Sequence, residues 1–160
     1  MVDVMDVCFL IPFLEEMSMG YGYFDEAFWV AMQIMCAKQK KEYIDPSEVT
    51  ALELEYGELT SLADLKYFPN IKYLALTMAE LENLDELATL PKLKSLKLEA
   101  CEIEDASAVW ELHNLSRLEI CFSSLGGKKQ LSKLEKLKRL TLSFMDLPEW
   151  TSMSVLENLE

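Results

Sequence analysis

A repeat of 22 residues, which recurs five times without a gap, constrains this chain more than any other feature. Each copy starts at an apolar residue, and the starts are Val49, Ile71, Leu93, Leu115 and Leu137. Three later columns are apolar in the same way: Leu52, Leu74, Leu96, Leu118 and Leu140; Leu54, Leu76, Leu98, Ile120 and Leu142; and Leu59, Leu81, Ile103, Leu125 and Leu147. A fixed period of about 20 to 50 residues is the signature of stacked repeat architectures.

The L-x-L core of each copy alternates with a period of two, as a short strand does, so its leucines should point inward and the intervening residues outward. The second half of each copy carries apolar residues at intervals of three, which is typical of short helical or 3₁₀ turns. One copy cannot bury its leucines alone, so neighbouring copies must stack and pair their strands in parallel. The sequence therefore predicts an α/β solenoid of five repeats with a parallel sheet on its concave face.

The residues that precede the repeats have the pattern of a helix that closes one end of the solenoid. Asp25 is a candidate N-cap for a helix that extends toward Lys41. The apolar face of this helix consists of Phe24, Ala27, Phe28, Ala31, Met32, Ile34 and Met35. We therefore expect a helical N-terminal cap over residues 1–48 and repeats over residues 49–160, folded as a single cooperative unit.

The repeats from Val49 to about Leu159 resemble the leucine-rich repeat family, and their 22-residue length resembles its short class, found in bacterial internalins. The passage from Phe24 to Leu54 resembles the internalin helical cap running into the first strand. The family usually places Asn after the strand, where its amide bonds to the backbone of the tight bend. Here that column reads Gly57, Ala79, Cys101, Ser123 and Met145. The resemblance implies the internalin fold with a different bend chemistry.

The outward strand positions form columns that run along the predicted concave face, spaced by about 4.8 Å per repeat. They combine aromatic residues with both signs of charge, which protein interfaces use as anchors. We predict a non-enzymatic protein–protein interaction module that binds its partner through Glu53, Glu55, Tyr56, Tyr73, Met78, Lys97, Glu99, Arg117, Glu119, Phe122, Arg139 and Phe144. A plain solvated sheet with aromatic residues packed at its rim is the alternative.

The chain is strongly acidic, with 28 Asp and Glu against 15 Lys and Arg and a net charge of -13. From Met1 to Glu111 there are 22 acidic and 8 basic residues. Such a field repels phosphate backbones and anionic lipid heads, so the expected partner is a protein with a basic surface and not a nucleic acid or a membrane. The alternative function is an acidic inhibitor or immunity-type protein that neutralises a basic partner such as a nuclease.

Few residues point to catalysis or to a cofactor. Glu55 and Glu99 lie two strands apart, roughly 10 Å, which is near the upper separation for inverting glycosidases, but solvated surface charges are the simpler interpretation. The single histidine, His113, falls at a return turn without a nucleophile beside it, and Gly126-Gly127-Lys128 lacks the rest of a P-loop. We expect no enzymatic activity, no metal and no cofactor.

Four cysteines, Cys8, Cys36, Cys101 and Cys121, occur without a C-x-x-C pair. Free thiols and a cytoplasmic location are expected, with a Cys8–Cys36 bridge and secretion after removal of a leader as open alternatives. The first 14 residues are apolar but carry no basic n-region, so we interpret them as structure. No apolar stretch approaches the roughly 20 residues that span a bilayer.

The last strand of the repeats, Arg139 to Ser143, is followed by a short tail with no further strand pattern. An unpaired edge of a sheet invites pairing with another chain. We therefore expect weak self-association through this C-terminal edge.

Overall fold

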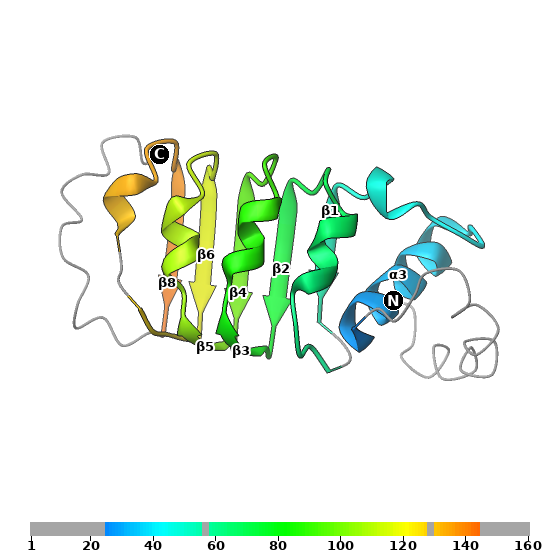
Figure 1. Ribbon diagram of the computed structural model, residues 1–160, viewed down its shortest axis with the longest axis horizontal. Coiled ribbons are helices and arrows are strands. Elements are labelled where there is room, and N and C mark those ends of the chain that lie inside the picture. The colour runs from blue at the N-terminus through cyan, green and yellow to red at the C-terminus, as the bar shows by residue number, and fades with distance from the viewer. Residues whose placement is uncertain (1–24, 56–57, 128–129, 145–160) are drawn as a thin grey trace.

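Each L-x-L core forms a strand, and the five strands pair in parallel in the order β1-β2-β4-β6-β8 (Figure 1). They are β1 (Ala51–Leu54), β2 (Tyr73–Thr77), β4 (Ser95–Glu99), β6 (Arg117–Cys121) and β8 (Arg139–Ser143). The computed structural model describes residues 25–55, 58–127 and 130–144. Paired residues are those that lie one repeat apart, such as Leu74 with Leu96 and Leu96 with Leu118. The predicted parallel sheet of five repeats is thus confirmed.

The inward leucines form one continuous hydrophobic core along the stack. In β1, β2, β4 and β6 both inward residues of each L-x-L core are buried. Burying one such side chain contributes roughly 1.5–3 kcal/mol. Leu140 and Leu142 of β8 are only half-buried, because β8 is the last strand of the sheet.

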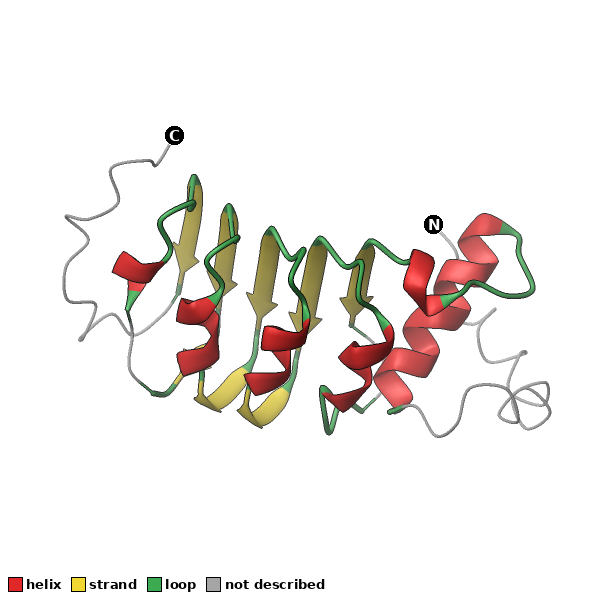
Figure 2. Ribbon diagram, turned by 45° about the horizontal axis from the view of Figure 1, so that its top comes forward, coloured by secondary structure: helices red, strands yellow, loops and turns green. Residues whose placement is uncertain are grey.

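The second half of each repeat turns back through a short 3₁₀ helix, as the three-residue spacing predicts. Figure 2 shows these helices on the side of the molecule opposite the five-stranded sheet. They are Ala63–Tyr67, Asp85–Thr89, Ser107–Glu111 and Leu131–Lys133. Their inward residues, Leu65, Leu87, Val109 and Leu131, are buried and continue the core.

Polar side chains one repeat apart join neighbouring coils at the loops that follow these helices. The ammonium group of Lys92 donates to the side-chain oxygen of Asn70, and that of Lys136 donates to the oxygen of Asn114 at 2.7 Å. The Asn114 amide donates in turn to the Pro91 carbonyl at 3.2 Å. This alternation of Asn and Lys ties each coil to the previous one at an exposed surface.

A second parallel sheet, which the sequence analysis did not predict, lies at the end of the repeats toward which the main strands run. Its strands are β3 (Glu80–Asn83), β5 (Glu102–Asp105) and β7 (Ser124–Leu125), in the order β3-β5-β7. Each strand contributes a single buried apolar residue, Leu81, Ile103 or Leu125. One apolar residue cannot show the alternation that identifies a strand in a sequence.

Helix α3 (Glu26–Gln39) closes the N-terminal end of the stack (Figure 1). Asp25 is its N-cap, as predicted, and accepts from the Ala27 N–H at 3.2 Å. The buried side chains of the helix are Ala27, Phe28, Ala31, Met32 and Cys36. The Phe28 ring lies 5.7 Å from that of Phe68, between ring centroids.

The predicted apolar face of the cap is therefore right in its first half and displaced in its second. Ile34 and Met35 are only half-buried, and Cys36 is buried in their place. Phe24 lies outside the described residues. A 3₁₀ helix, Pro46–Glu48, leads from the cap into β1. The boundary between cap and repeats at residues 48 and 49 stays a prediction.

Candidate functional site

The centre of the concave face is a cluster of side chains around Tyr73. Burial raises the pKa of the Tyr73 hydroxyl, and the nearby carboxylate of Glu53 raises it further. The charges of Lys97, Arg117 and Glu119 also act on this hydroxyl. The structure thus gathers five of the predicted site residues, from β1, β2, β4 and β6, on one patch of the sheet.

Two of the concave carboxylates have a basic neighbour on their own strand. Lys97 Nζ lies 2.5 Å from Glu99 Oε2, and this hydrogen bond raises the pKa of Lys97. On the next strand, Arg117 Nε lies 4.0 Å from Glu119 Oε1. Both pairs are partly solvated, so each stabilises the fold by at most about 1 kcal/mol. They fix the orientation of charged groups on the face more than they hold it together.

The other predicted strand positions lie nearer the two ends of the sheet. Glu55 follows β1 and is exposed, and Arg139 on β8 is exposed as well. Glu55 and Glu99 are not an equivalent pair of carboxylates, because the Lys97 ammonium group binds Glu99. Ala75, which lies between Glu53 and Lys97 in the register, is buried beneath the surrounding side chains.

Four residues that directly follow the strands form an exposed edge of the concave face, which we call the rim: Met78, Ala100, Phe122 and Phe144. Met78 is 68% exposed, Phe122 58% and Phe144 79%. The rings of Phe122 and Phe144 stack with centroids 4.5 Å apart and an angle of 8° between planes. Tyr56, predicted as the first member of this column, lies outside the described residues.

The rim has an unusual backbone conformation, because all four residues have positive φ angles between 52° and 55°. This left-handed region is ordinarily the place of glycine or asparagine, and bulky residues there are rare. The conformation is held by backbone bonds one repeat apart: Phe122 N–H donates to Ser143 O and Met78 N–H to Glu99 O, both at 2.9 Å. The bend points large apolar side chains away from the core.

The column after the rim replaces the expected asparagines with small buried residues. Ala79, Cys101 and Ser123 are all buried. The Ser123 hydroxyl accepts from Cys101 N–H at 3.0 Å and donates to Cys121 O at 2.9 Å, and the Cys101 thiol lies 3.4 Å from Leu76 O. A hydroxyl and a thiol thus supply part of the bonding that an asparagine amide supplies in the family.

No protein-family model and no curated protein matches the chain. Its fold does match solved structures, one of which is the crystal structure of an internalin, inlF, from Listeria monocytogenes str. 4b F2365. The match has a TM-score of 0.58 and 25% sequence identity, and it covers 71% of this chain. The chain is an internalin-like leucine-rich repeat solenoid. It spans only about a third of that internalin, since the match covers 32% of the longer chain.

His113 of the solenoid lies with the 3₁₀ helices, away from the concave face. Its Nδ1 is 3.3 Å from the Lys133 carbonyl oxygen, and its Nε2 is 3.9 Å from Glu111 Oε2. Glu111 also accepts from the Lys133 ammonium group, which lowers the pKa of this carboxyl. All three residues join two neighbouring coils. Within the described residues, no group of His, Cys, Asp and Glu is placed to hold a metal ion.

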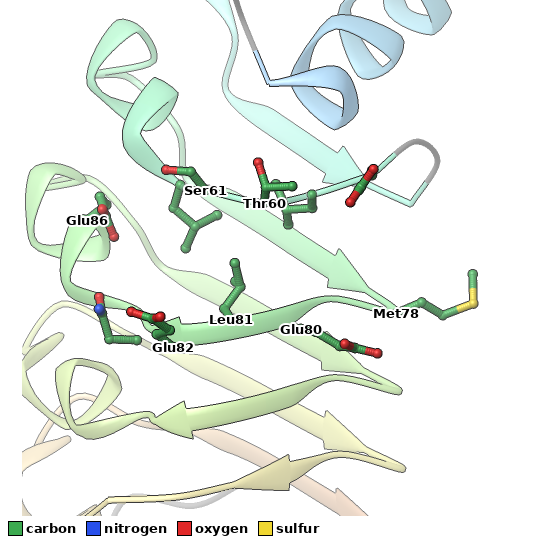
Figure 3. A pocket seen from close by; sticks show the side chains of 11 residues that line it. Thr60, Ser61, Met78, Glu80, Leu81, Glu82 and Glu86 are labelled. Atoms are coloured by element: carbon green, nitrogen blue, oxygen red, sulfur yellow. The ribbon is translucent and has the colours of Figure 1, made fainter.

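A groove of about 700 Å³ lies between the first repeat of the solenoid and β3 (Figure 3). Thr60 and Ser61 line one side, and Glu80, Leu81 and Glu82 of β3 line the other. Sequence reasoning missed this groove. The available signal was that every exposed residue of β3 and β5 except Asn83 is acidic and that the chain has no Lys or Arg between residues 73 and 91.

Among the described helices, none is both long enough and apolar enough to cross a membrane. Cys36 and Cys101 are buried free thiols, and Cys121 is a half-buried one. Cys8, the other partner in the Cys8–Cys36 alternative, lies outside the described residues, whereas Cys36 is free in the structure. Burial raises the pKa of both Cys36 and Cys101, which keeps these thiols protonated.

Proposed function

We propose that this solenoid is a protein-binding module whose contact surface is the concave face together with its rim. The stacked Phe122–Phe144 pair carries the proposal. Contact with water is unfavourable for large apolar side chains that are more than half exposed. Burial of these side chains by a partner is favourable and stabilises the complex. A backbone in the left-handed region that holds these rings outward is the kind of local strain that accompanies binding sites.

The composition of the concave face supports the same proposal. Tyr73 and Arg117 are residue types that anchor protein interfaces, and Lys97 and Glu119 beside them add polar groups for hydrogen bonds at the margin. The strands hold these side chains on a rigid sheet, so little conformational entropy is lost on binding. Leucine-rich repeat solenoids typically bind proteins, and their concave faces are recurrent contact surfaces.

The charge of the concave face separates this proposal from that of an acidic inhibitor. Four carboxylates, Glu53, Glu55, Glu99 and Glu119, stand against three cations, Lys97, Arg117 and Arg139, which leaves a balance of -1. Nearly all of the net charge of -13 therefore lies elsewhere on the chain. Long-range electrostatic attraction through this face would be weak, so contact chemistry is the better basis for its function.

Affinity capture from cells of the source organism tests the proposal. The baits are the unchanged chain, the double variant Phe122→Ala/Phe144→Ala, and Ser132→Ala, which changes an exposed residue on the 3₁₀ side. A partner should be retained by the first and the third and lost by the second, with at least about tenfold weaker binding when it is purified. Identical capture by all three would show that the rim is not the contact surface.

Salt dependence distinguishes the two functions once the partner is known. For the module, raising the ionic strength from about 0.05 to 0.5 M should change the association rate by less than roughly threefold. For an acidic inhibitor that acts on a basic protein, the same change should slow association by more than about tenfold. If the protein is a binding module, Tyr73→Ala should weaken its affinity for the partner. If it is an acidic inhibitor, the same change should leave that affinity nearly unchanged.

Two further properties belong to the same proposal. Free Cys36, Cys101 and Cys121 support work in a reducing compartment such as the cytoplasm. The position of β8 as the last strand of its sheet supports weak self-association through that edge. Residues 145–160 lie outside the described residues, so light scattering over a concentration series is the appropriate test.

A further inference from the structure

We propose that the groove beside β3 binds an extended, basic segment of another protein, which joins the β3-β5-β7 sheet as a fourth strand. This site rests on different observations from those for the concave face, although one rim residue, Met78, also lines the groove. β3 is the terminal strand of its sheet on the side of the first repeat. No strand of the described residues pairs with β3 on this side, and the groove of about 700 Å³ beside it gives the room that a peptide strand needs.

The edge is open because the first repeat does not form the strand that its later copies form. Residues 58–61 are one repeat before β3, yet Asp25 at the start of α3 binds this segment. The Asp25 carboxylate accepts from Thr60 N–H at 2.9 Å, from the Thr60 hydroxyl at 2.6 Å and from Ser61 N–H at 3.1 Å. These bonds hold the segment against the cap and use the N–H groups of Thr60 and Ser61, so the segment does not pair with β3.

The backbone groups that the edge offers can be assigned from the ladder. Glu102 N–H donates to Ala79 O at 2.8 Å, so the groups of Ala79 are directed toward β5. In a parallel ladder the direction alternates from one residue to the next. The C=O of Glu80 and both the N–H and the C=O of Glu82 are therefore directed away from β5 and toward the groove. A strand placed there can bond to both residues.

The charge of the groove selects a basic partner. Four glutamates line it, Glu58, Glu80, Glu82 and Glu86, and no Lys or Arg does. In the same sheet Glu80 is directly opposite Glu102, and like charges in that arrangement repel. On the concave face, by contrast, Glu99 and Glu119 have cationic neighbours. Lysine or arginine side chains from a partner would relieve this repulsion.

The apolar part of the lining sets the pattern of the partner strand. Leu59 is only half-buried, whereas Leu81, Ile103 and Leu125 in the same column of later repeats are buried. Leu59, Leu62 and Leu81 line the groove. An added strand places alternate side chains on opposite faces. The partner segment should therefore alternate basic residues, near the glutamates, with apolar residues, near the leucines.

A peptide titration on the full chain tests the proposal. The probe is a fluorescein-labelled octapeptide of alternating lysine and valine, with binding followed by fluorescence anisotropy. One comparison peptide carries glutamate in place of lysine. The other keeps the lysines and carries N-methyl groups on the amides along one edge of the strand. Strand addition requires that the basic peptide bind, that N-methylation weaken it at least about tenfold, and that the acidic peptide not bind.

Protein variants make the test specific for β3. Glu82→Pro removes the N–H directed toward the groove and spares the ladder to β5, as proline does on an edge strand. This variant should bind the basic peptide at least about tenfold more weakly than the unchanged chain does. Glu82→Gln should reduce the affinity less, because only charge is lost. Glu104→Gln, a matched change on β5, should alter binding by less than about twofold. Phe122→Ala should leave it unchanged.

Each contrary result overturns the proposal. Failure of the basic peptide to bind removes the site altogether. Full binding of the N-methylated peptide, which does not depend on any variant folding, excludes strand addition. Equal binding of the acidic peptide excludes charge selection. Amide NMR shifts that move on β4 and β6, and not at Glu80 and Glu82, would place the peptide on the concave face.

Discussion

Replacing Asp25 tests how the cap is joined to the repeats. One oxygen of its carboxylate accepts from Ala27 N–H within the cap, and the other accepts from Thr60 and Ser61 in the first repeat. Its own backbone N–H donates to Asp64 Oδ2 at 2.7 Å. Asp25→Ala keeps this backbone bond and removes every bond made by the side chain. We expect the cap and the first repeat to separate more easily.

The magnitude follows from the bonds that are lost. An N-cap side chain contributes about 1 kcal/mol. Each hydrogen bond to Thr60 or Ser61 contributes a net of roughly 0.5–1.5 kcal/mol, because both residues are exposed and water can replace the carboxylate. With three such bonds, the sum for Asp25→Ala is about 2.5–5.5 kcal/mol of unfolding free energy. For a chain of this size, that lowers Tm by roughly 5–20 °C.

Urea unfolding and thermal melts, both followed by far-UV circular dichroism, measure the change. Glu26→Ala is the matched control, since it removes the same charge from the next residue, which is exposed. It should cost less than about 1 kcal/mol, the size of a helix-dipole effect. Asp25→Asn should fall between the two. If Asp25→Ala costs no more than Glu26→Ala, the carboxylate does not join the cap to the repeats, and our explanation of the open β3 edge fails with it.

Three other experiments test the core, the second sheet and the thiols. Leu96→Ala should lower the free energy of unfolding in urea by roughly 3–5 kcal/mol, because Leu96 is 0% exposed. The same change at its neighbour, Lys97→Ala, should lower it by under about 1 kcal/mol. Similar losses for both variants would refute the assignment of inward and outward positions. Gly126→Ala should cost roughly 2–3 kcal/mol in the same assay, because a Cβ there would lie 1.9 Å from the Glu104 carbonyl oxygen, and a neutral result would contradict that close approach. In a thiol titration of the native protein Cys121 should react fast and Cys101 slowly, since burial raises the pKa of Cys101; equal rates would contradict this.

The main sheet could be predicted because one numerical period fixes it. A spacing of 22 residues places Leu74 beside Leu96 whatever the loops between them do, and alternation then decides which side chains are inside. The β3-β5-β7 sheet could not be predicted in this way. Its strands are two to four residues long and bury one side chain each. They exist because tight bends in successive repeats bring the same short segments side by side.

The candidate sites depended on features that a period does not contain. The outward direction of Phe122 followed from the repeat, but its left-handed backbone did not, because local preference disfavours a bulky residue there. The groove depends on contacts between residues 35 and 36 apart, from Asp25 to Thr60 and Ser61. Asp25 was identified as an N-cap from its position before an apolar helix. Its second role needed the three-dimensional placement of the cap.

The two proposed surfaces should differ in how salt affects their affinity for a partner. The concave face is nearly neutral and presents exposed rings, so its affinity rests on apolar contact that salt does not weaken. The groove beside β3 is lined by four glutamates without a cation, so its affinity rests largely on charge and should fall as ions screen it. A partner that uses both surfaces would lose the groove contact first as salt rises. Hydrogen exchange on such a complex at two salt concentrations would then show protection lost at Glu80 and Glu82 while the amides of Phe122 and Phe144 stay protected. Simultaneous loss at both places would mean that the surfaces act as one site.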